Sequence, residues 1–185
     1  MRYFFLVNSA LAGLLIILVG GMIPSATLMI NNKFSFEIIE IPISYQVPAL
    51  LLTGLLCGPK AGTIAAIAYL TIGLFYLPVF QGGGSIGYIA TPGFGYLASF
   101  VPAVWITGQI VQLRSKNSIY NLFRASISGL TIIHMVGIIN ILIGTLTSRW
   151  NYSLIELLYI YSISNLPFQI LLCIPIILLA KSLRK

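Results

Sequence analysis

The sequence predicts an all-α integral membrane protein with six transmembrane helices and both termini in the cytoplasm. Only ten of its 185 residues are basic and three are acidic, while 58% are hydrophobic. The mean hydropathy of the chain is +1.01. A water-soluble domain of this size and hydropathy would expose far too much apolar surface. The apolar runs are long enough to cross about 30 Å of hydrocarbon as helices, and the basic residues between them indicate an orientation.

Six apolar runs provide the expected helices. They are Phe4–Ile23, Val47–Cys57, Ala61–Leu77, Tyr96–Leu113, Ala125–Leu146 and Leu154–Ala180. The second run is too short to cross the bilayer unless flanking residues join it. A transmembrane β-barrel is not expected, because its strands would alternate apolar and polar residues in segments of about ten. We expect one domain, 1–185, formed by a single helical bundle.

The charge distribution predicts the orientation, because basic residues accumulate in short cytoplasmic loops. One side of the membrane receives only basic residues, namely Arg2, Lys60, Arg114, Lys116, Arg124, Lys181, Arg184 and Lys185. The opposite side receives both signs, namely Lys33, Arg149, Glu37, Glu40 and Glu156. Both ends of this multi-pass protein of the cell membrane therefore lie in the cytoplasm. The net charge of +7 is explained by topology and anionic lipid, so a nucleic-acid partner is not expected.

An enzymatic site is not expected, because titratable groups are nearly absent from the apolar runs. The chain has one histidine, His134, and its neighbours on a helical face supply no further metal ligand. Neither a metal nor a cofactor is therefore expected. Metalloprotease, nucleophile-elbow and phosphate-loop motifs do not occur in the sequence. His134 is either a functional residue or, as is commoner in membranes, a neutral histidine bonded to another helix.

The amides of the last runs are further candidates. Asn165 and Gln169 lie on one helical face, because they are four residues apart, and Pro167 between them leaves a backbone carbonyl without its usual partner. Ligand contact and helix–helix contact are both open for this pair. Asn140, close to Gly137 in the fifth run, is expected to bond across to a neighbouring helix.

Small residues recur at every fourth position from Gly95 to Thr107, and again at Ser9 and Gly13. Such spacing lets two helices approach closely. It is compatible with a contact inside the bundle or with a docking surface for another protein.

Two external segments are long enough to contact a ligand. Pro24–Gln46 mixes apolar and polar residues in a way suited to a lid over the mouth of the bundle. Tyr76–Leu97 is neutral and rich in glycine, which lets the main chain approach a small uncharged ligand closely. A plain hairpin between two membrane helices is the alternative for this second segment.

Two stretches carry a resemblance to a known family. One is IPISYQVPALLLTGLLCGPKAGTIAAIAYLTIGLFYLPVFQGGG, which begins at Ile41, and the other is TPGFGYLASF, which ends at Phe100. Their ordered pieces PIS.Q, L..GLL.GP..G, Y...G...LPVF.GG and P..GY resemble the BioY family, the biotin-binding S components of energy-coupling factor (ECF) transporters. That family has six membrane helices with both ends inside, in agreement with the layout expected from the charges.

The resemblance implies a subunit that captures biotin at the external face for uptake into the cell. Members of the family dock on a transmembrane ECF coupling protein that carries two ABC-type ATPases, so this chain would itself hydrolyse nothing. The family docks through small residues on the first helix, and Ser9 and Gly13 are their nearest equivalent here. The implied partners are biotin, the lipid bilayer, the coupling protein and the ATPases.

The last helix departs from the family pattern. BioY relatives commonly carry Pro-Gly-Asp-x-x-Lys there, whereas this chain has PFQILL from Pro167 to Leu172 and so lacks both charges. Some relatives also carry an asparagine and an arginine where this chain has Gly83, Gly84 and Leu97. A ureido ring would then be held by amides and backbone, since an amide both donates and accepts hydrogen bonds. The ligand carboxylate would lie near the lid or a helix N-terminus.

The expected binding site is uncharged and external. Its residues are Gln46, Gln81, Gly83, Gly84, Ser85, Tyr88, Thr91, Tyr96, Asn165 and Gln169. Two other functions stay open at this point. One is a transporter of a related small molecule that works alone, and the other is a membrane assembly or regulatory protein that binds no ligand.

Overall fold

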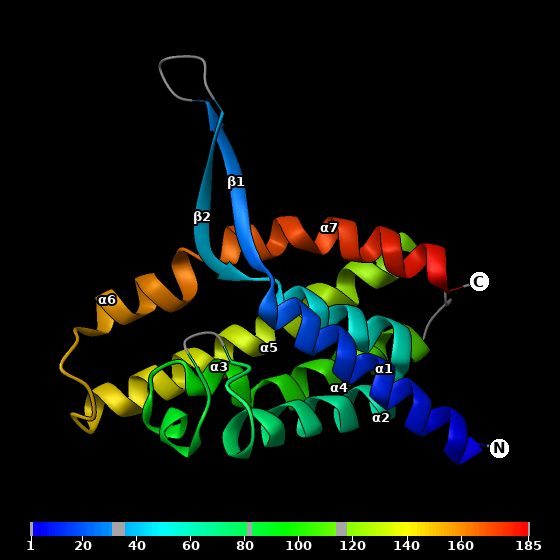
Figure 1. Ribbon diagram of the computed structural model, residues 1–185, viewed down its shortest axis with the longest axis horizontal. Helices are drawn as coiled ribbons and strands as arrows, with labels where there is room; N and C mark the ends of the chain where they lie inside the picture. Colours follow the sequence, from blue (N-terminus) through cyan, green and yellow to red (C-terminus); the bar gives the residue numbers. More distant parts are fainter. Residues whose placement is uncertain (1, 31–35, 81–82, 114–117, 185) are drawn as a thin grey trace.

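The structure is a computed structural model that describes residues 2–30, 36–80, 83–113 and 118–184. Its elements are α1 Arg2–Met22, β1 Pro24–Ile30, β2 Phe36–Ser44, α2 Gln46–Phe75, η1 Ile86–Ala90, α3 Phe94–Ala98, α4 Phe100–Leu113, α5 Ile119–Leu146, α6 Leu154–Leu158, η2 Tyr159–Ile163 and α7 Leu166–Leu183. The helices form one elongated body, and α1 begins at the same end of this body at which α7 finishes (Figure 1).

The described chain contains five helices that are long and apolar enough to cross a membrane. They are Tyr3–Met22, Gln46–Phe75, Phe94–Leu113, Ile119–Leu146 and Leu154–Leu183. The prediction of a helical protein with several membrane spans is therefore confirmed. Six separate long helices are not found, because the predicted runs Val47–Cys57 and Ala61–Leu77 both fall largely in α2. Large apolar side chains such as Leu146, 85% exposed, cover the outer faces, as expected where lipid is the solvent.

α2 reverses its direction at Gly58, where the backbone has φ 76° and ψ −179°. Residues that carry a side chain rarely adopt this backbone conformation, so the turn favours glycine. Gln46 in the first arm donates a hydrogen bond of 2.7 Å to the Tyr69 hydroxyl in the second arm. A β-carbon on Gly62 would lie 3.8 Å from the α-carbon of Gly54. The two arms of α2 therefore lie side by side and run antiparallel.

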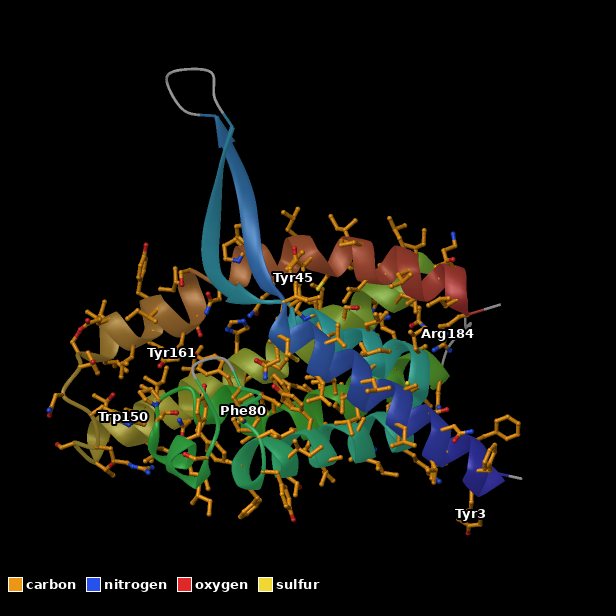
Figure 2. All side chains as sticks on the ribbon, viewed as in Figure 1. Tyr3, Tyr45, Phe80, Trp150, Tyr161 and Arg184 are labelled. Carbon is orange, nitrogen blue, oxygen red and sulfur yellow. The ribbon has the colours of Figure 1, made fainter. Side chains whose placement is uncertain are left out.

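The end of α7 is tied to this reversal. Leu55 lies in the last turn of the first arm, and Pro59, four residues later, has no N–H to offer its carbonyl. The Arg184 guanidinium donates a hydrogen bond to that Leu55 carbonyl instead. Burial lowers the pKa of the guanidinium. Figure 2 shows Arg184 at the end of the helical body where Tyr3 also lies.

Pro102 explains the break between α3 and α4. Proline has no N–H for the carbonyl of Ala98, and α3 ends at Ala98 while α4 begins at Phe100. The Ser99 hydroxyl at the break donates a hydrogen bond to the Tyr96 carbonyl. The break thereby helps to hold Tyr96, one of the predicted site residues.

The segment predicted as a lid forms a β-hairpin, which is an addition to the predicted all-α bundle. β1 and β2 pair antiparallel, with Leu28 opposite Ile38. Their register shifts between Pro24 and Ser25, opposite Pro42, which cannot donate a hydrogen bond to the ladder. The hairpin projects away from the helices (Figure 1). It does not lie across the bundle as the lid prediction expected.

Two clusters of buried apolar side chains hold the helices together. The first includes Ile17, Leu50, Tyr69, Phe80, Phe100, Val104 and Ile133. The second includes Leu51, Leu55, Val111, Leu122, Cys173 and Ile177. Burying a large apolar side chain contributes roughly 1.5–3 kcal/mol relative to exposure in water, although in lipid close packing and hydrogen bonds decide helix association.

Candidate functional site

A π-helical turn in the last span supplies two residues of the candidate site. This turn, η2, covers Tyr159–Ile163. Pro167 follows at the start of α7 and has no N–H for the Ile163 carbonyl, so the regular helical ladder is interrupted. The turn directs Tyr161 and Ser162 toward side chains of α3 and α5. Turns of this kind often occur at functional sites.

Four polar side chains form one hydrogen-bonded network across these helices. The hydroxyl oxygens of Tyr96 and Ser162 are 2.6 Å apart. Ser162 Oγ lies 3.1 Å from Nδ1 of His134, and His134 Nε2 lies 2.9 Å from Oε1 of Gln169. Ser162, His134 and Gln169 are all buried. The predicted residues Tyr96 and Gln169 are thus linked through a serine and a histidine.

Aromatic rings flank this network. Tyr96 stacks on Tyr161 with ring centroids 5.9 Å apart and 21° between the ring planes. Its ring lies edge-on to His134 at 5.8 Å. Gly137 on α5 makes this approach feasible, because a β-carbon there would lie 2.4 Å from the Tyr96 ring. The site therefore combines apolar ring faces with a few placed polar groups, as small-molecule sites do.

Tyr88 in η1 brings another phenol close to Tyr161. A β-carbon on Gly93 would lie 3.2 Å from both the Tyr88 hydroxyl and the Tyr161 ring. Burial raises the pKa of the Tyr88 phenol, and the nearby Tyr161 raises it further. Tyr88 is therefore protonated at neutral pH, and its hydroxyl can donate and accept hydrogen bonds.

Two side chains near the end of α5 fasten the loop that carries η1. Asn140 Nδ2 donates a hydrogen bond of 3.1 Å to the Pro92 carbonyl. The expected partner was a neighbouring helix, whereas Pro92 lies in the loop between η1 and α3. Trp150 Nε1 donates one of 2.8 Å to the Ala90 carbonyl. Figure 2 shows Trp150 and Tyr161 in the same half of the body, opposite the half with Arg184. The loop is therefore held beside the network.

Gln46 and Thr91 use their side-chain donors inside the scaffold. Gln46 is buried and donates to the Tyr69 hydroxyl, which in turn donates 2.8 Å to the Val79 carbonyl. Thr91 Oγ1 donates 2.7 Å to the carbonyl of Tyr88. Both residues support the glycine-rich loop, and ligand contact by either of them stays a prediction.

Asn165 also turns back on its own chain. Its amide nitrogen lies 3.2 Å from the Ile160 carbonyl and 3.3 Å from the Tyr161 carbonyl. Those carbonyls lie in η2, where the helical ladder is irregular. The roles left open for Asn165 were ligand contact and helix–helix contact, but its amide nitrogen bonds within its own span, whereas Gln169 belongs to the network. Ligand contact by Asn165 stays a prediction.

The glycine-rich loop between α2 and η1 contains two positions that require glycine. Gly83 has a φ of +116°, a conformation that favours glycine. A β-carbon on Gly84 would lie 2.6 Å from the carbonyl oxygen of Gly73. Ser85 is exposed, and Gln81 lies outside the described residues. Ligand contact by Gly83, Gly84 and Ser85 stays a prediction.

Gly13 of α1 lies against α2. A β-carbon on Gly13 would lie 2.6 Å from Cγ2 of Thr53 and 3.2 Å from Cβ of Ala65. Gly13 is buried and Ser9 is half-buried. This seam joins α1 to both arms of α2, and docking of a partner at Ser9 and Gly13 stays a prediction.

Tyr161 and Ser162 were not among the predicted site residues. Ser162 precedes Gln169 by seven residues, which is about two helical turns, so the two lie near one face of the span. That spacing is a local signal from which Ser162 could have been identified. Tyr161 has no such signal, because its partner Tyr96 is distant in the sequence and a π-helical turn sets its direction.

The arrangement can bind a neutral polar ring. It offers hydroxyl, imidazole and amide groups beside stacked phenols, and the network side chains carry no carboxylate, ammonium or guanidinium. Within the described residues, no three His, Cys, Asp or Glu side chains come together as a metal site. Donors and acceptors in a water-poor environment bind complementary groups strongly, because unpaired groups there are costly.

Comparison with known proteins identifies similar chains. The family model described as the BioY family matches residues 6–185. A probable biotin transporter BioY of Lysinibacillus sphaericus is 35% identical over 98 residues, which are 53% of this chain and 50% of that protein. The match thus spans about half the length of this relative. An uncharacterized 21.2 kDa protein of Cyanophora paradoxa is 30% identical over 157 residues, 84% of this chain and 81% of that protein.

One solved structure has a similar fold along almost the whole chain. It is a crystal structure of the S-component for biotin from an ECF-type ABC transporter. The TM-score is 0.74, and the superposition covers 99% of this chain and 92% of that one. The two sequences are 23% identical, so the similarity establishes the shared fold.

Proposed function

Because this chain belongs to the BioY family, we propose that it is a biotin-binding S component that takes part in biotin uptake across the cell membrane. It captures biotin at its external face and delivers it through an ECF coupling protein and its ATPases. Catalysis of ATP hydrolysis belongs to those partners.

The observation that carries this proposal is the uncharged network of Tyr96, Ser162, His134 and Gln169 beside stacked phenols. The ureido ring of biotin is flat, neutral and polar, with one carbonyl oxygen and two N–H groups. Amide and hydroxyl groups complement both kinds of atom. A neutral site also suits a buried position, since it leaves no ion uncompensated in hydrocarbon.

The biotin carboxylate requires a different environment from the ring. Arg149 is exposed just beyond α5 and stacks over the Trp150 ring at 5.9 Å. Trp150 is itself bonded to the loop that carries η1. We assign the carboxylate to the Arg149 side of the site, where a guanidinium can bind it while it stays in contact with water.

The proposed topology has six crossings with both termini in the cytoplasm. The reversal of α2 at Gly58 adds one crossing to the five apolar helices, and α1 begins where α7 finishes (Figure 1). Basic residues Arg124 and Lys181 lie on that side and Glu156 on the other, in keeping with the positive-inside rule. The first arm of α2 rises by only about 18 Å at about 1.5 Å per residue, so flanking residues complete its crossing.

Purified protein in lipid nanodiscs is expected to bind radiolabelled biotin saturably at micromolar or lower concentration. Unlabelled biotin should displace the label, while riboflavin, which has no ureido ring fused to a thiolane, should not. Absence of displaceable binding at micromolar biotin would contradict the proposed function and favour a relative that no longer binds ligand.

Partner association separates this proposal from a transporter that works alone. An affinity-tagged chain, expressed in its own cells and extracted in mild detergent, is expected to retain a membrane coupling protein together with ATPase subunits. The matched control is an unrelated multi-pass protein with the same tag. If the chain accumulates biotin in vesicles without those subunits, the solitary transporter is the correct function.

A further inference from the structure

His134 joins two segments of the last span to α5. It is buried, with Nδ1 3.1 Å from Ser162 Oγ and Nε2 2.9 Å from Gln169 Oε1. Both partners are uncharged, so an imidazolium would be buried here without a counter-charge, which is unfavourable. The imidazole is therefore neutral and carries one proton, on one of its two nitrogens.

The hydrogen-bond chemistry determines which nitrogen carries that proton. A carboxamide oxygen only accepts, so Nε2 of His134 must donate to Gln169 Oε1. Nδ1 is then an acceptor, and the Ser162 hydroxyl donates its single proton to it. The Tyr96 hydroxyl, 2.6 Å from Ser162 Oγ, consequently donates to Ser162. The network thus runs in one direction, from Tyr96 to Gln169.

The direction of the network determines which hydrogen-bonding groups of Gln169 are available to a ligand. Its oxygen is occupied by His134, whereas its amide N–H groups have no hydrogen-bond partner among the described residues. A free glutamine side chain could rotate and offer either its oxygen or its nitrogen. Held by the imidazole, the carboxamide keeps its oxygen on the His134 side and directs its N–H donors away from it.

We propose that His134 is a positioning residue that makes Gln169 a dedicated hydrogen-bond donor, so that the site selects a ring bearing a carbonyl oxygen. This inference rests on the proposed function for its ligand, since the ureido oxygen of biotin is such an acceptor. A ligand with an N–H group at the same place meets another donor and is rejected, because both groups lose their hydrogen bonds to water.

The tautomer can be measured without any ligand. The chain has a single histidine, so protein labelled with ¹⁵N-histidine, after removal of any histidine tag, yields one imidazole in the NMR spectrum. We expect a protonated Nε2 and an unprotonated Nδ1. A protonated Nδ1 with an unprotonated Nε2, or two protonated nitrogens, would overturn the proposed direction whether or not biotin binds.

The selectivity is tested with biotin and 2-iminobiotin, whose guanidine is protonated at neutral pH and so presents an N–H donor and a positive charge in place of the ureido oxygen. The cost of burying that charge is common to the parent and the variants, so the comparison is made between proteins for each ligand. In His134→Leu, biotin affinity should fall by up to about tenfold, because binding must then order a Gln169 side chain that His134 no longer holds. The affinity for 2-iminobiotin should be unchanged or higher, because Gln169 can then rotate and present its oxygen. A role in packing alone would lower both affinities together and would contradict the proposal.

Two further variants distinguish positioning from general support. His134→Gln places an amide near the position of Nε2 and should restore most of the preference for biotin. His134→Asn reaches only the position of Nδ1, beside Ser162, and should behave like His134→Leu. Equal behaviour of the glutamine and asparagine variants would overturn the assignment. If the parent protein binds neither compound, the proposed function fails, while the NMR result still decides the direction of the network.

Discussion

Replacing Gln169 by leucine is expected to weaken biotin binding by about 1–3 kcal/mol, the cost of leaving buried polar groups without partners. The ligand would lose a donor, and Nε2 of His134, now 2.9 Å from the amide oxygen, would lose its acceptor. The two side chains are similar in volume, so the change is mainly in hydrogen bonding. Isothermal titration of the variant and the parent in nanodiscs measures the difference.

Gln112→Leu is the matched control, because Gln112 is an exposed glutamine at the end of α4 and lies beside Gly58. Its replacement should leave biotin affinity unchanged. Equal affinities of the Gln169→Leu protein and the parent would show that the ligand binds elsewhere.

Gly58→Ala is expected to lower the free energy of unfolding by about 1–3 kcal/mol, the strain of a side chain at a glycine-only conformation. The backbone at this position has φ 76° and ψ −179°, and relaxing it would separate the two arms of α2. The added β-carbon would also lie 2.6 Å from Nε2 of Gln112, the mobile end of a long side chain. Thermal unfolding in detergent, followed by circular dichroism, measures the effect.

Gly87→Ala provides the comparison for this variant. Gly87 is exposed, and its added β-carbon would meet only the Ser85 hydroxyl oxygen, at 3.3 Å, which can rotate away. Its unfolding temperature should match that of the parent. If Gly58→Ala also unfolds at the parent temperature, α2 does not reverse through a glycine-only conformation.

The number of helices shows which features of the fold hydropathy alone can predict. The predicted boundary between Val47–Cys57 and Ala61–Leu77 is the place where α2 reverses, so the interruption was located correctly. Pro24–Gln46 was expected to form a lid over the bundle, but its strands β1 and β2 pair with each other and stand away from the helices (Figure 1). Whether such a segment covers a bundle depends on tertiary contacts that its own composition does not encode.

In the site too, the sequence identified individual residues, whereas their contacts depend on tertiary packing. Gln169 was a candidate because it shares a helical face with Asn165. One of the two roles considered for His134 was a histidine bonded to another helix, which it is. Their pairing was not predicted, since they are separated by 35 positions. Asn165 had the same spacing argument as Gln169, yet its amide turns to carbonyls of η2.

The sequence by itself determined that this chain is a helical membrane protein, because hydropathy is a sum over residues and needs no knowledge of contacts. It also indicated the interruption between Val47–Cys57 and Ala61–Leu77 and the carbonyl that Pro167 leaves without its usual partner, because a missing N–H acts locally. The break at Pro102 was not predicted, since Tyr96–Leu113 was expected to be one continuous run. Only the tertiary structure decided which polar groups meet. The bond between His134 and Gln169 depends on how α5 packs against the last span. Local sequence patterns do not determine the packing of helices that are distant in the sequence.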